Sequence, residues 1–417
     1  MKISKIMARE IFDSRACPTV LCEIYLSNGQ SVTASVPSGA SRGFNEVFEL
    51  RDGGKRLNGQ GVTKAVDTIE TIIAPLLIGQ EPDVVEIDGL LRELDATVDK
   101  HKLGGNVLLA VSMATCRAQA LMHEIQLYEL LAELCQADTV SLPFPLINII
   151  NGGVHANNSI PIQEFLLAPM GFQNFREAFE ASIEIFYEMK FILKQRGLSI
   201  ATGDEGGFAP FFKNENEPFE LLLESLVRSG LEEHFSIAID VAANQLYDPE
   251  KSLYRWYNNE YVSSDDLIEK YKKWNAAYRL FSVEDGCAEF DIQGWTTLSY
   301  TLGDQMQLVG DDIFTTRASA IERGIKEGIA NAVVIKPNQI GTISETLEVI
   351  VLCQENNLNS IVSHRSGETM DTFIADLAVG AGAGQIKVGG LFHGERIEKY
   401  NRLLQIEDML VFASLDI

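Results

Sequence analysis

The sequence predicts an α/β protein with two parts, a small N-terminal α+β cap domain over residues 1–137 and an irregular barrel over residues 138–417. Short apolar runs recur eight times after residue 145, and amphipathic segments long enough for helices separate most of them. The length of 417 residues also exceeds the usual size of one domain, which is about 100–200 residues.

The composition is that of an ordinary folded protein, with 46% hydrophobic and 22% charged residues. The net charge of −25 provides no basic surface for nucleic acid or for an anionic membrane, so we expect a small-molecule ligand instead. No apolar run is long enough to insert in a membrane, and the N-terminus lacks the apolar core of a signal peptide. The 6 cysteines are scattered without disulfide or zinc spacing, so we expect a cytoplasmic location.

The N-terminal part begins with β-rich runs at 19–25 and 31–36, and the turn residues between them predict a hairpin. Apolar residues at helical spacing predict a helix over 62–77, and the Ala-rich segment 106–122 predicts a closely packed helix. The segment 137–145 contains two prolines that interrupt helical periodicity, so we place the domain boundary there.

The eight apolar runs beyond this boundary predict strands at 146–150, 163–167, 236–239, 280–283, 307–310, 332–335, 360–363 and 385–388. Eight strands that alternate with helices form a closed barrel of the TIM type. The first two strands are separated by too few residues for a crossover helix, so this pair should be antiparallel. Two helices, at 175–196 and 218–228, fit before the third strand. The predicted order is therefore ββαα(βα)6.

Polar residues end six consecutive predicted strands: Asp240, Glu284, Asp311, Lys336, the run His364, Arg365 and Ser366, and Lys387. The carboxyl ends of barrel strands meet at one mouth, where barrel enzymes carry their chemistry. One such residue alone could be part of a buried ion pair. Many buried charges are costly unless a metal, a substrate or partner groups offset them, so the pattern favours an active site.

The residue types indicate acid/base chemistry on an anion. Asp240, Glu284 and Asp311 offer an all-oxygen site of the kind that Mg²⁺ prefers. Lys336, on the next strand, could act as a general base if a metal and burial lower its pKa. The residues suited to binding a phosphate are His364, Arg365, Ser366 and Lys387.

Two glutamates are expected on the opposite side of the mouth. Glu164 starts the second strand, and Glu205 lies in the Gly-rich loop 203–207, where it could also be a solvated loop acid. Two carboxyls opposite a lysine would form an acid/base pair across a substrate. The small-residue loop 38–43 could be a simple turn or a lid that reaches the mouth, and the sequence leaves both open.

From end to end the sequence resembles the enolase family. The matching runs are AREIFDSR, VPSGAS, NIINGGVHANN, QEFLLAP, GDEGGFAP, IDVAA, EDGCAE, LVGDD, IKPNQIGT, SHRSGET and GAGQIK. The resemblance implies the fold described above. It also implies a phosphopyruvate hydratase of glycolysis and gluconeogenesis, which reversibly dehydrates 2-phospho-D-glycerate to phosphoenolpyruvate with two Mg²⁺ ions per active site.

The resemblance also implies a role for each site residue. It makes Lys336 the base and Glu205 the acid, supported by Glu164. The residues it implies as metal ligands are Asp240, Glu284 and Asp311 for the first Mg²⁺ and Ser41 for the second. The residues it implies at the phosphate and around the pocket are Arg365, Ser366, His155, Gln163, His364 and Lys387.

Some positions depart from the residues usual in the family: Ala16, Cys17, Arg42, Phe211, Arg317, Val388 and Gly390. Arg42 lies in the loop that could be a lid, which leaves open a paralogue acting on a related phosphonate or phosphorylated acid. A non-catalytic binding protein on the same scaffold, with a cell-surface or secreted pool by family analogy, is the other alternative. A binding role, however, needs none of the catalytic residues.

The family resemblance further implies a homodimer or a higher homo-oligomer. Family dimers pair an arginine near the N-terminus with a glutamate near the C-terminus, which matches Arg9 and Glu395. A second interface pair falls at Leu21 and Gln405, which are both uncharged. The joint loss of both charges leaves no unpaired charge in the interface.

Overall fold

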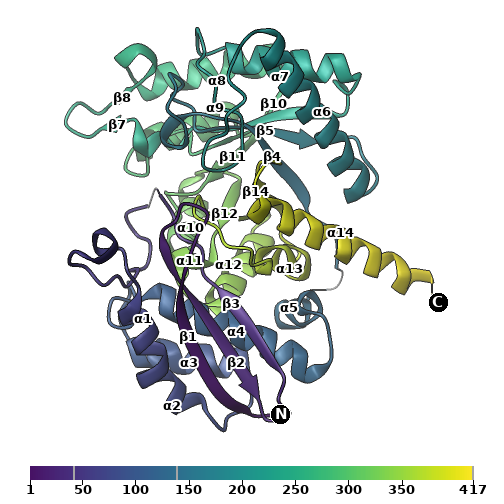
Figure 1. Cartoon of the computed structure of the whole chain (residues 1–417). Helices are drawn as coiled ribbons and strands as arrows, with labels where there is room; N and C mark the ends of the chain where they lie inside the picture. The colour runs from purple at the N-terminus through teal and green to yellow at the C-terminus, as the bar shows by residue number, and fades with distance from the viewer. Residues whose placement is uncertain (41–42, 138–139, 416–417) are drawn as a thin grey trace.

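The computed structural model describes residues 1–40, 43–137 and 140–415, and it contains a small N-terminal α+β part beside a closed barrel (Figure 1). The predicted fold class is therefore confirmed. The domain boundary between 137 and 138 stays a prediction, because residues 138 and 139 lie outside the described residues.

The N-terminal sheet is antiparallel, in the order β1 (Ile3–Phe12), β2 (Pro18–Leu26) and β3 (Ser31–Ser35). The predicted hairpin is β2–β3. The first strand, β1, is not predicted by the sequence, because charged residues on its exposed face obscure the alternation of the buried residues Ile3, Ile6 and Ala8.

Helices cover this sheet and connect it to the barrel. They are α1 (Thr63–Thr68), α2 (Ala74–Leu77), α3 (Val84–Asp95), α4 (Gly105–His123) and α5 (Leu127–Cys135). A π-helical turn at Ile69–Ile73 joins α1 to α2, so the helix predicted over 62–77 is continuous but locally widened. The predicted Ala-rich helix is α4, which packs against β2 and β3.

The barrel closes in the order β10-β11-β12-β13-β14-β4-β5-β6. The strands are β4 (Phe144–Asn151), β5 (Glu164–Pro169), β6 (Phe235–Asp240), β10 (Leu280–Glu284), β11 (Gln307–Gly310), β12 (Ala332–Ile335), β13 (Asn359–Ser363) and β14 (Gly384–Gly389). β5 runs antiparallel to both β4 and β6, whereas the other neighbours are parallel. All eight predicted strands and the antiparallel first pair are confirmed.

The helices of the barrel follow the predicted order, with α6 (Phe175–Gln195) and α7 (Glu217–Ser229) before β6. The others are α8 (Ser264–Tyr278), α9 (Ile292–Leu302), α10 (Ala318–Glu327), α11 (Pro337–Ile340), α12 (Ile343–Glu355), α13 (Phe373–Gly380) and α14 (Gly394–Leu415). The sequence analysis missed a small sheet of β7 (Tyr247–Asp248), β8 (Leu253–Arg255) and β9 (Tyr261–Val262). Strands of two or three residues are too short to show a periodicity.

The barrel interior below the mouth is packed with small and branched apolar side chains. They are Leu146, Leu166, Ala168, Ala238, Val309, Ala332, Val334 and Ile361. All are almost completely buried, so the barrel is a core rather than a channel. A ligand can therefore reach only the ends of the barrel.

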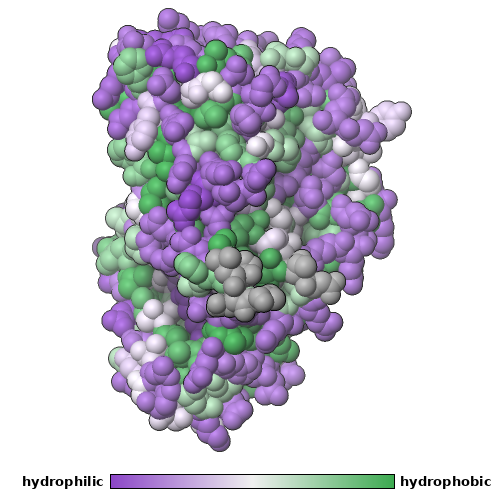
Figure 2. All heavy atoms as spheres, turned by 90° about the vertical axis from the view of Figure 1, so that its right-hand side faces the viewer, coloured by the Kyte–Doolittle hydropathy of each residue, from purple (hydrophilic) through white to green (hydrophobic). Residues whose placement is uncertain are grey.

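Figure 2 shows polar side chains over most of one face, with smaller hydrophobic areas between them. Among the described helices, none has the length and apolar character needed to cross a membrane. The cytoplasmic location stays a prediction.

A buried carboxyl joins the N-terminal part to the barrel. Asp88 of α3 is fully buried, and its Oδ2 accepts hydrogen bonds from Ser112 Oγ and from the backbone N of Ser344, each at 2.9 Å. Ser344 belongs to the first turn of α12, so Asp88 satisfies one of the amides at the start of a barrel helix. Burial raises the pKa of Asp88 to about 6.

This raised pKa predicts a pH-dependent contribution to stability. The carboxyl of an unfolded aspartate has a pKa near 4, whereas that of Asp88 in the folded protein is about 6. The folded state therefore binds the Asp88 proton more tightly than the unfolded state does. As the pH rises from about 4 through 6, Asp88 loses this proton and the folded state loses stability. Between about pH 5 and pH 7 the wild type should lose about 1 kcal/mol more unfolding free energy than the Asp88→Asn variant. Urea unfolding at several pH values measures the difference. The exposed Glu93→Gln change on the same helix should keep the wild-type slope, and parallel slopes for wild type and Asp88→Asn would contradict the assignment.

Candidate active site

The predicted site residues meet at one mouth of the barrel because of the strand register. Asp240 at the end of β6 lies opposite Glu284 of β10 on one side and opposite Glu164 of β5 on the other. β5 runs antiparallel, so its first residue reaches the mouth that the other strands reach with their last residues. Asp311 and Lys336 directly follow β11 and β12.

A cavity at this mouth is lined by most of the predicted residues. They are His155, Gln163, Glu205, Asp240, Asp311, Lys336, His364, Arg365, Ser366 and Lys387. Glu164 and Glu284 lie next to the cavity and contact Lys387. Ser41, the predicted ligand of a second metal, and Arg42 lie outside the described residues.

Lys387 contacts three of the buried carboxyls at the mouth, which we call the carboxylate side of the cavity. Its buried Nζ lies 2.9 Å from Asp240 Oδ2, 2.9 Å from Glu284 Oε2 and 2.7 Å from Glu164 Oε2. Burial alone would lower the pKa of Lys387, but the three carboxyls outweigh it and raise this pKa well above its usual value. Lys387 is therefore a permanent cation that neutralises part of the charge of the site.

Lys336 forms a close ion pair with Asp311. Lys336 precedes Pro337, which starts the short helix α11, and this turn places the lysine at the rim of the cavity. Burial favours the neutral amine, but Asp311 outweighs this effect and raises the pKa of Lys336. The lowering of this pKa that the sequence analysis expected from a bound metal and from burial stays a prediction. In the ion pair with Asp311 the amine is protonated, so it must lose this proton before it can act as a base.

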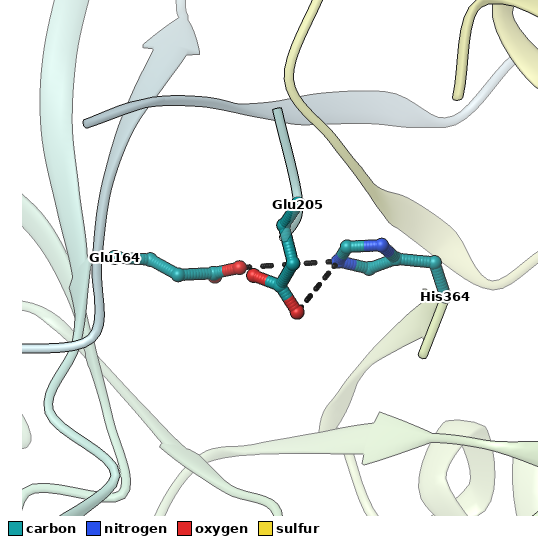
Figure 3. A group of neighbouring side chains, drawn as sticks. All are labelled: Glu164, Glu205 and His364. Carbon is teal, nitrogen blue, oxygen red and sulfur yellow. Dashed lines mark ion pairs between the residues drawn. The ribbon is translucent and has the colours of Figure 1, made fainter. Parts of the chain in front are cut away.

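Next to Lys387 the cavity holds a buried pair of glutamates. Figure 3 shows Glu164 and Glu205 pointing toward each other and toward His364, whose Nε2 lies 3.9 Å from Glu164 Oε1 and 3.9 Å from Glu205 Oε1. Burial, with the neighbouring Glu205, raises the pKa of Glu164 to about 8. Glu164 therefore holds a proton at neutral pH. The alternative that Glu205 is a solvated loop acid is wrong, because Glu205 is only 5% exposed.

Further polar side chains hold this acid pair. His155 Nε2 lies 3.3 Å from Glu205 Oε1, and burial lowers the pKa of His155. Asn148, which the sequence analysis missed, donates to Glu164 Oε1 at 3.0 Å. Gln163 places its amide Nε2 3.4 Å from Asp240 Oδ2 and so connects the glutamate side to the carboxylate side.

A close backbone approach holds the loop of Glu205. The backbone N of Gly390 donates to the Glu205 carbonyl at 2.7 Å, and a Cβ at position 390 would lie 2.5 Å from the backbone carbon of Gly206. A side chain at Gly390 would therefore push this loop away. Gly390 therefore lets the end of β14 pack directly against the loop that carries Glu205.

Arg396 of α14, which the sequence analysis missed, organises the histidine and phosphate side. It is completely buried, and its Nη1 lies 2.7 Å from His364 Nδ1. Nη1 also donates to the carbonyl of Arg365, and Nη2 donates to the carbonyl of Ser366. Burial and the Arg396 charge lower the pKa of His364 well below its usual value. The guanidinium can only donate, so Nδ1 accepts and Nε2 carries the ring proton toward the glutamates.

Two further aspartates, Asp285 and Asp312, adjoin the predicted metal ligands. The Asp285 carboxylate accepts from the backbone N of Asp311 at 2.9 Å and of Asp312 at 3.1 Å. Burial raises the pKa of Asp285 well above its usual value, and burial with Asp311 raises that of Asp312 to about 7. Both residues directly follow a charged strand-end residue, which was a usable sequence signal.

The donor set fits a divalent cation. Asp240, Glu284 and Asp311 offer only oxygen ligands, and the pKa of Glu284 is raised well above its usual value by burial and by Asp240. A buried carboxyl of this kind would ionise more readily beside a bound cation. In the described part of the chain, the groups whose ligand atoms all lie within 4.8 Å of one another are Asp285, Asp311 and Asp312, and Glu164, Glu205 and His364. The trio of Asp240, Glu284 and Asp311 is not among them, so this ligand set stays a prediction.

A barrel whose mouth brings a lysine and buried carboxyls into one cavity, with an arginine beside them, defines an acid/base barrel enzyme. The family model for the enolase C-terminal TIM barrel domain matches residues 139–414, and the model for the enolase N-terminal domain matches residues 3–131. A protein named enolase from a Nitratiruptor species is 46% identical over 413 residues, which cover 98% of this chain and 97% of that protein.

The chain belongs to the enolase family and is a lyase, a phosphopyruvate hydratase. Family membership implies a metal cofactor and a phosphorylated small-molecule substrate. It also disfavours the non-catalytic alternative considered from the sequence.

Proposed function

We propose that this protein catalyses the Mg²⁺-dependent, reversible dehydration of 2-phospho-D-glycerate to phosphoenolpyruvate, in glycolysis and gluconeogenesis. The observation that carries the proposal is the arrangement of Lys336 and Glu205 around one cavity that Arg365 also lines. A base, an acid and a phosphate-binding cation are the groups that this elimination needs.

The two proton transfers can be assigned to this chain's side chains. The Nζ of Lys336 removes the proton from the carbon next to the substrate carboxylate, and the electron pair of that C–H bond moves toward the carboxylate. Glu205 then protonates the departing hydroxyl, which leaves as water while the double bond forms. Burial and the neighbouring Glu205 raise the pKa of Glu164 to about 8, so Glu164 is protonated at neutral pH. A protonated Glu164 beside Glu205 supports the role of Glu205 as the acid.

The remaining pocket residues would bind and orient the substrate. Arg365 and Ser366 would hold the phosphate, and His155, Gln163, His364 and Lys387 would complete the pocket. Ser366 Oγ accepts a hydrogen bond from the Ala40 backbone N at 2.7 Å, so residues 38–40, at the start of the loop 38–43, reach the mouth of the barrel. This contact supports the lid interpretation of that loop over a simple turn.

We propose two Mg²⁺ ions per site, the first held by Asp240, Glu284 and Asp311. Ser41, outside the described residues, stays the expected ligand of the second. When bound, Mg²⁺ supplies the positive charge that stabilises the second negative charge created by removing a proton beside a carboxylate.

Two variants distinguish the role of the base, Lys336, from the role of the acid, Glu205. Lys336→Ala should lower kcat by about 10²–10⁴-fold and should also abolish exchange of the substrate's C2 proton with deuterated solvent. Glu205→Gln should lower the dehydration rate by a similar factor but retain this exchange, because the base is intact. Absorbance of phosphoenolpyruvate measures dehydration, and NMR measures the exchange.

The wild type provides the reference for this experiment. Negligible turnover of 2-phospho-D-glycerate at saturating Mg²⁺ would favour the paralogue that acts on a related phosphonate or phosphorylated acid. Undiminished proton exchange in Lys336→Ala would refute Lys336 as the base.

Binding of Mg²⁺ can be measured without turnover. Addition of Mg²⁺ should raise the melting temperature of the wild type, because the ion binds only the folded site. The shift should be largely lost in Glu284→Gln and retained in Glu289→Gln, whose carboxyl is outside the proposed ligand set. Removal of the ion by a chelator should abolish activity, and an equal shift in Glu284→Gln would contradict the ligand assignment.

We also propose that the protein is a homodimer. Leu21 and Glu395, two of the positions matched to family interface residues, line one surface cavity together with Phe12 and Met370. Phe12 is 56% exposed and Met370 is 59% exposed in the single chain, which is unusual for large apolar side chains placed together. Arg9 pairs within the chain with Glu23 at 2.6 Å.

Sedimentation velocity tests this assembly. The wild type should sediment with twice the mass of the chain, and Phe12→Asp should shift it toward the monomer, because the change places a charge in an apolar interface. Tyr300→Asp, at a 93% exposed position on α9, is the matched control and should leave the mass unchanged. A monomeric wild type would contradict the proposal.

A further inference from the structure

A carboxylate from the N-terminal part binds the arginine of the proposed phosphate site. Glu46 Oε2 lies 3.1 Å from Arg365 Nη1, and Glu46 Oε1 lies 3.1 Å from Arg365 Nη2. Both side chains are buried, with 7% of the Glu46 side chain and 4% of the Arg365 side chain exposed. This two-point geometry fixes the plane of a guanidinium as well as its position.

The Glu46 carboxylate is itself held by donors from two sides. Gln339 Nε2 lies 3.3 Å from Glu46 Oε1, and the backbone N of Gly43 donates to the same oxygen at 3.2 Å. The backbone of the next residue is also docked, since the N of Val47 donates to the Gln339 carbonyl at 3.1 Å. Glu46 is therefore an anchored group rather than a side chain that swings freely.

Gln339 extends this contact to the base. Its side chain is fully buried, and its Nε2 also donates to Asp311 Oδ1 at 3.0 Å. Its Oε1 accepts from Thr316 Oγ1 at 2.7 Å, which fixes the orientation of the amide. Asp311 pairs with Lys336, so one hydrogen-bonded chain joins Glu46 to the proposed base.

The segment that carries Glu46 is docked on the barrel by other contacts as well. The rings of Phe44 and Phe290 meet edge to face with centroids 5.8 Å apart. Arg317, one of the departures from the family pattern, donates from Nε to the carbonyl of Asn45. Residues that follow the neighbouring strands β10 and β11 thus hold this segment of the N-terminal part against the barrel.

We propose that Glu46 is a positioning residue that fixes the guanidinium plane of Arg365 for phosphate binding and so makes that binding depend on docking of the N-terminal part. The inference rests on the proposed function, because it gives Arg365 the phosphate. The anchoring by Gln339 and Gly43 favours positioning over the alternative, in which Glu46 occupies the phosphate position and leaves when substrate arrives.

The Glu46→Gln variant tests the proposal, because it keeps the size of the side chain and removes the charge. The KM for 2-phospho-D-glycerate should rise about tenfold or more, whereas kcat should change by less than about threefold. The affinity for inorganic phosphate, measured by calorimetry with Mg²⁺ present, should fall by a similar factor. The melting temperature should fall, because Arg365 is left buried without its partner, so both constants are measured at a temperature where the variant is fully folded. Glu46→Asp keeps the charge but is one methylene shorter. Its KM and its phosphate affinity should lie between those of the wild type and those of Glu46→Gln.

Glu49→Gln is the matched control. Glu49 lies three residues further along the same segment and also pairs with an arginine, Arg51, so the substitution removes a comparable ion pair away from the cavity. It should leave the KM and the phosphate affinity unchanged.

The outcomes separate this inference from the proposed function. An unchanged KM and phosphate affinity in Glu46→Gln would overturn the inference, and so would a lower KM, which would show that Glu46 competes with phosphate. A wild type that binds phosphate but does not turn over 2-phospho-D-glycerate would remove the proposed function. In that case the phosphate affinity of Glu46→Gln alone decides the inference. A wild type that shows no measurable affinity for phosphate would overturn the inference about Glu46.

Discussion

The concentration of buried carboxyls at the barrel mouth is the constraint on which the site depends. Lys387 is surrounded by Asp240, Glu164 and Glu284, and its pKa is raised well above its usual value as a result. Even so, burial and neighbouring acids raise the pKa of Glu164 and of Glu284. Ionising all of these buried acids is costly without further positive charge, and such a site is suited to binding cations.

The N-terminal part contributes directly to this balance of charge. Glu46 binds Arg365 from outside the barrel, and the backbone of Ala40 donates to Ser366. A second junction, at Asp88, satisfies an amide at the start of α12. The two parts of the chain therefore share the site. A change at their junction can alter substrate binding without touching the residues that transfer protons.

Much of the barrel and many of the site residues could be predicted because burial leaves a clear pattern. Strands buried on both faces read as continuous apolar runs, and a charge at the end of such a run has few places to point except the mouth. The pattern failed for β1, whose exposed face is charged, and for the very short strands β7–β9. It also failed for Arg396 and Asn148, which resemble ordinary polar residues of a helix and a strand.

The sequence by itself determined which segments form the barrel strands, in what order, and which charged residues gather at its mouth. Only the tertiary structure decided the pairing of those charges: Lys336 with Asp311, Arg365 with Glu46, and His364 with Arg396. The physical reason is distance. Buried charges interact strongly over a few ångströms, and such separations are set by strand register and by the docking of segments far apart in the chain, which no local pattern records.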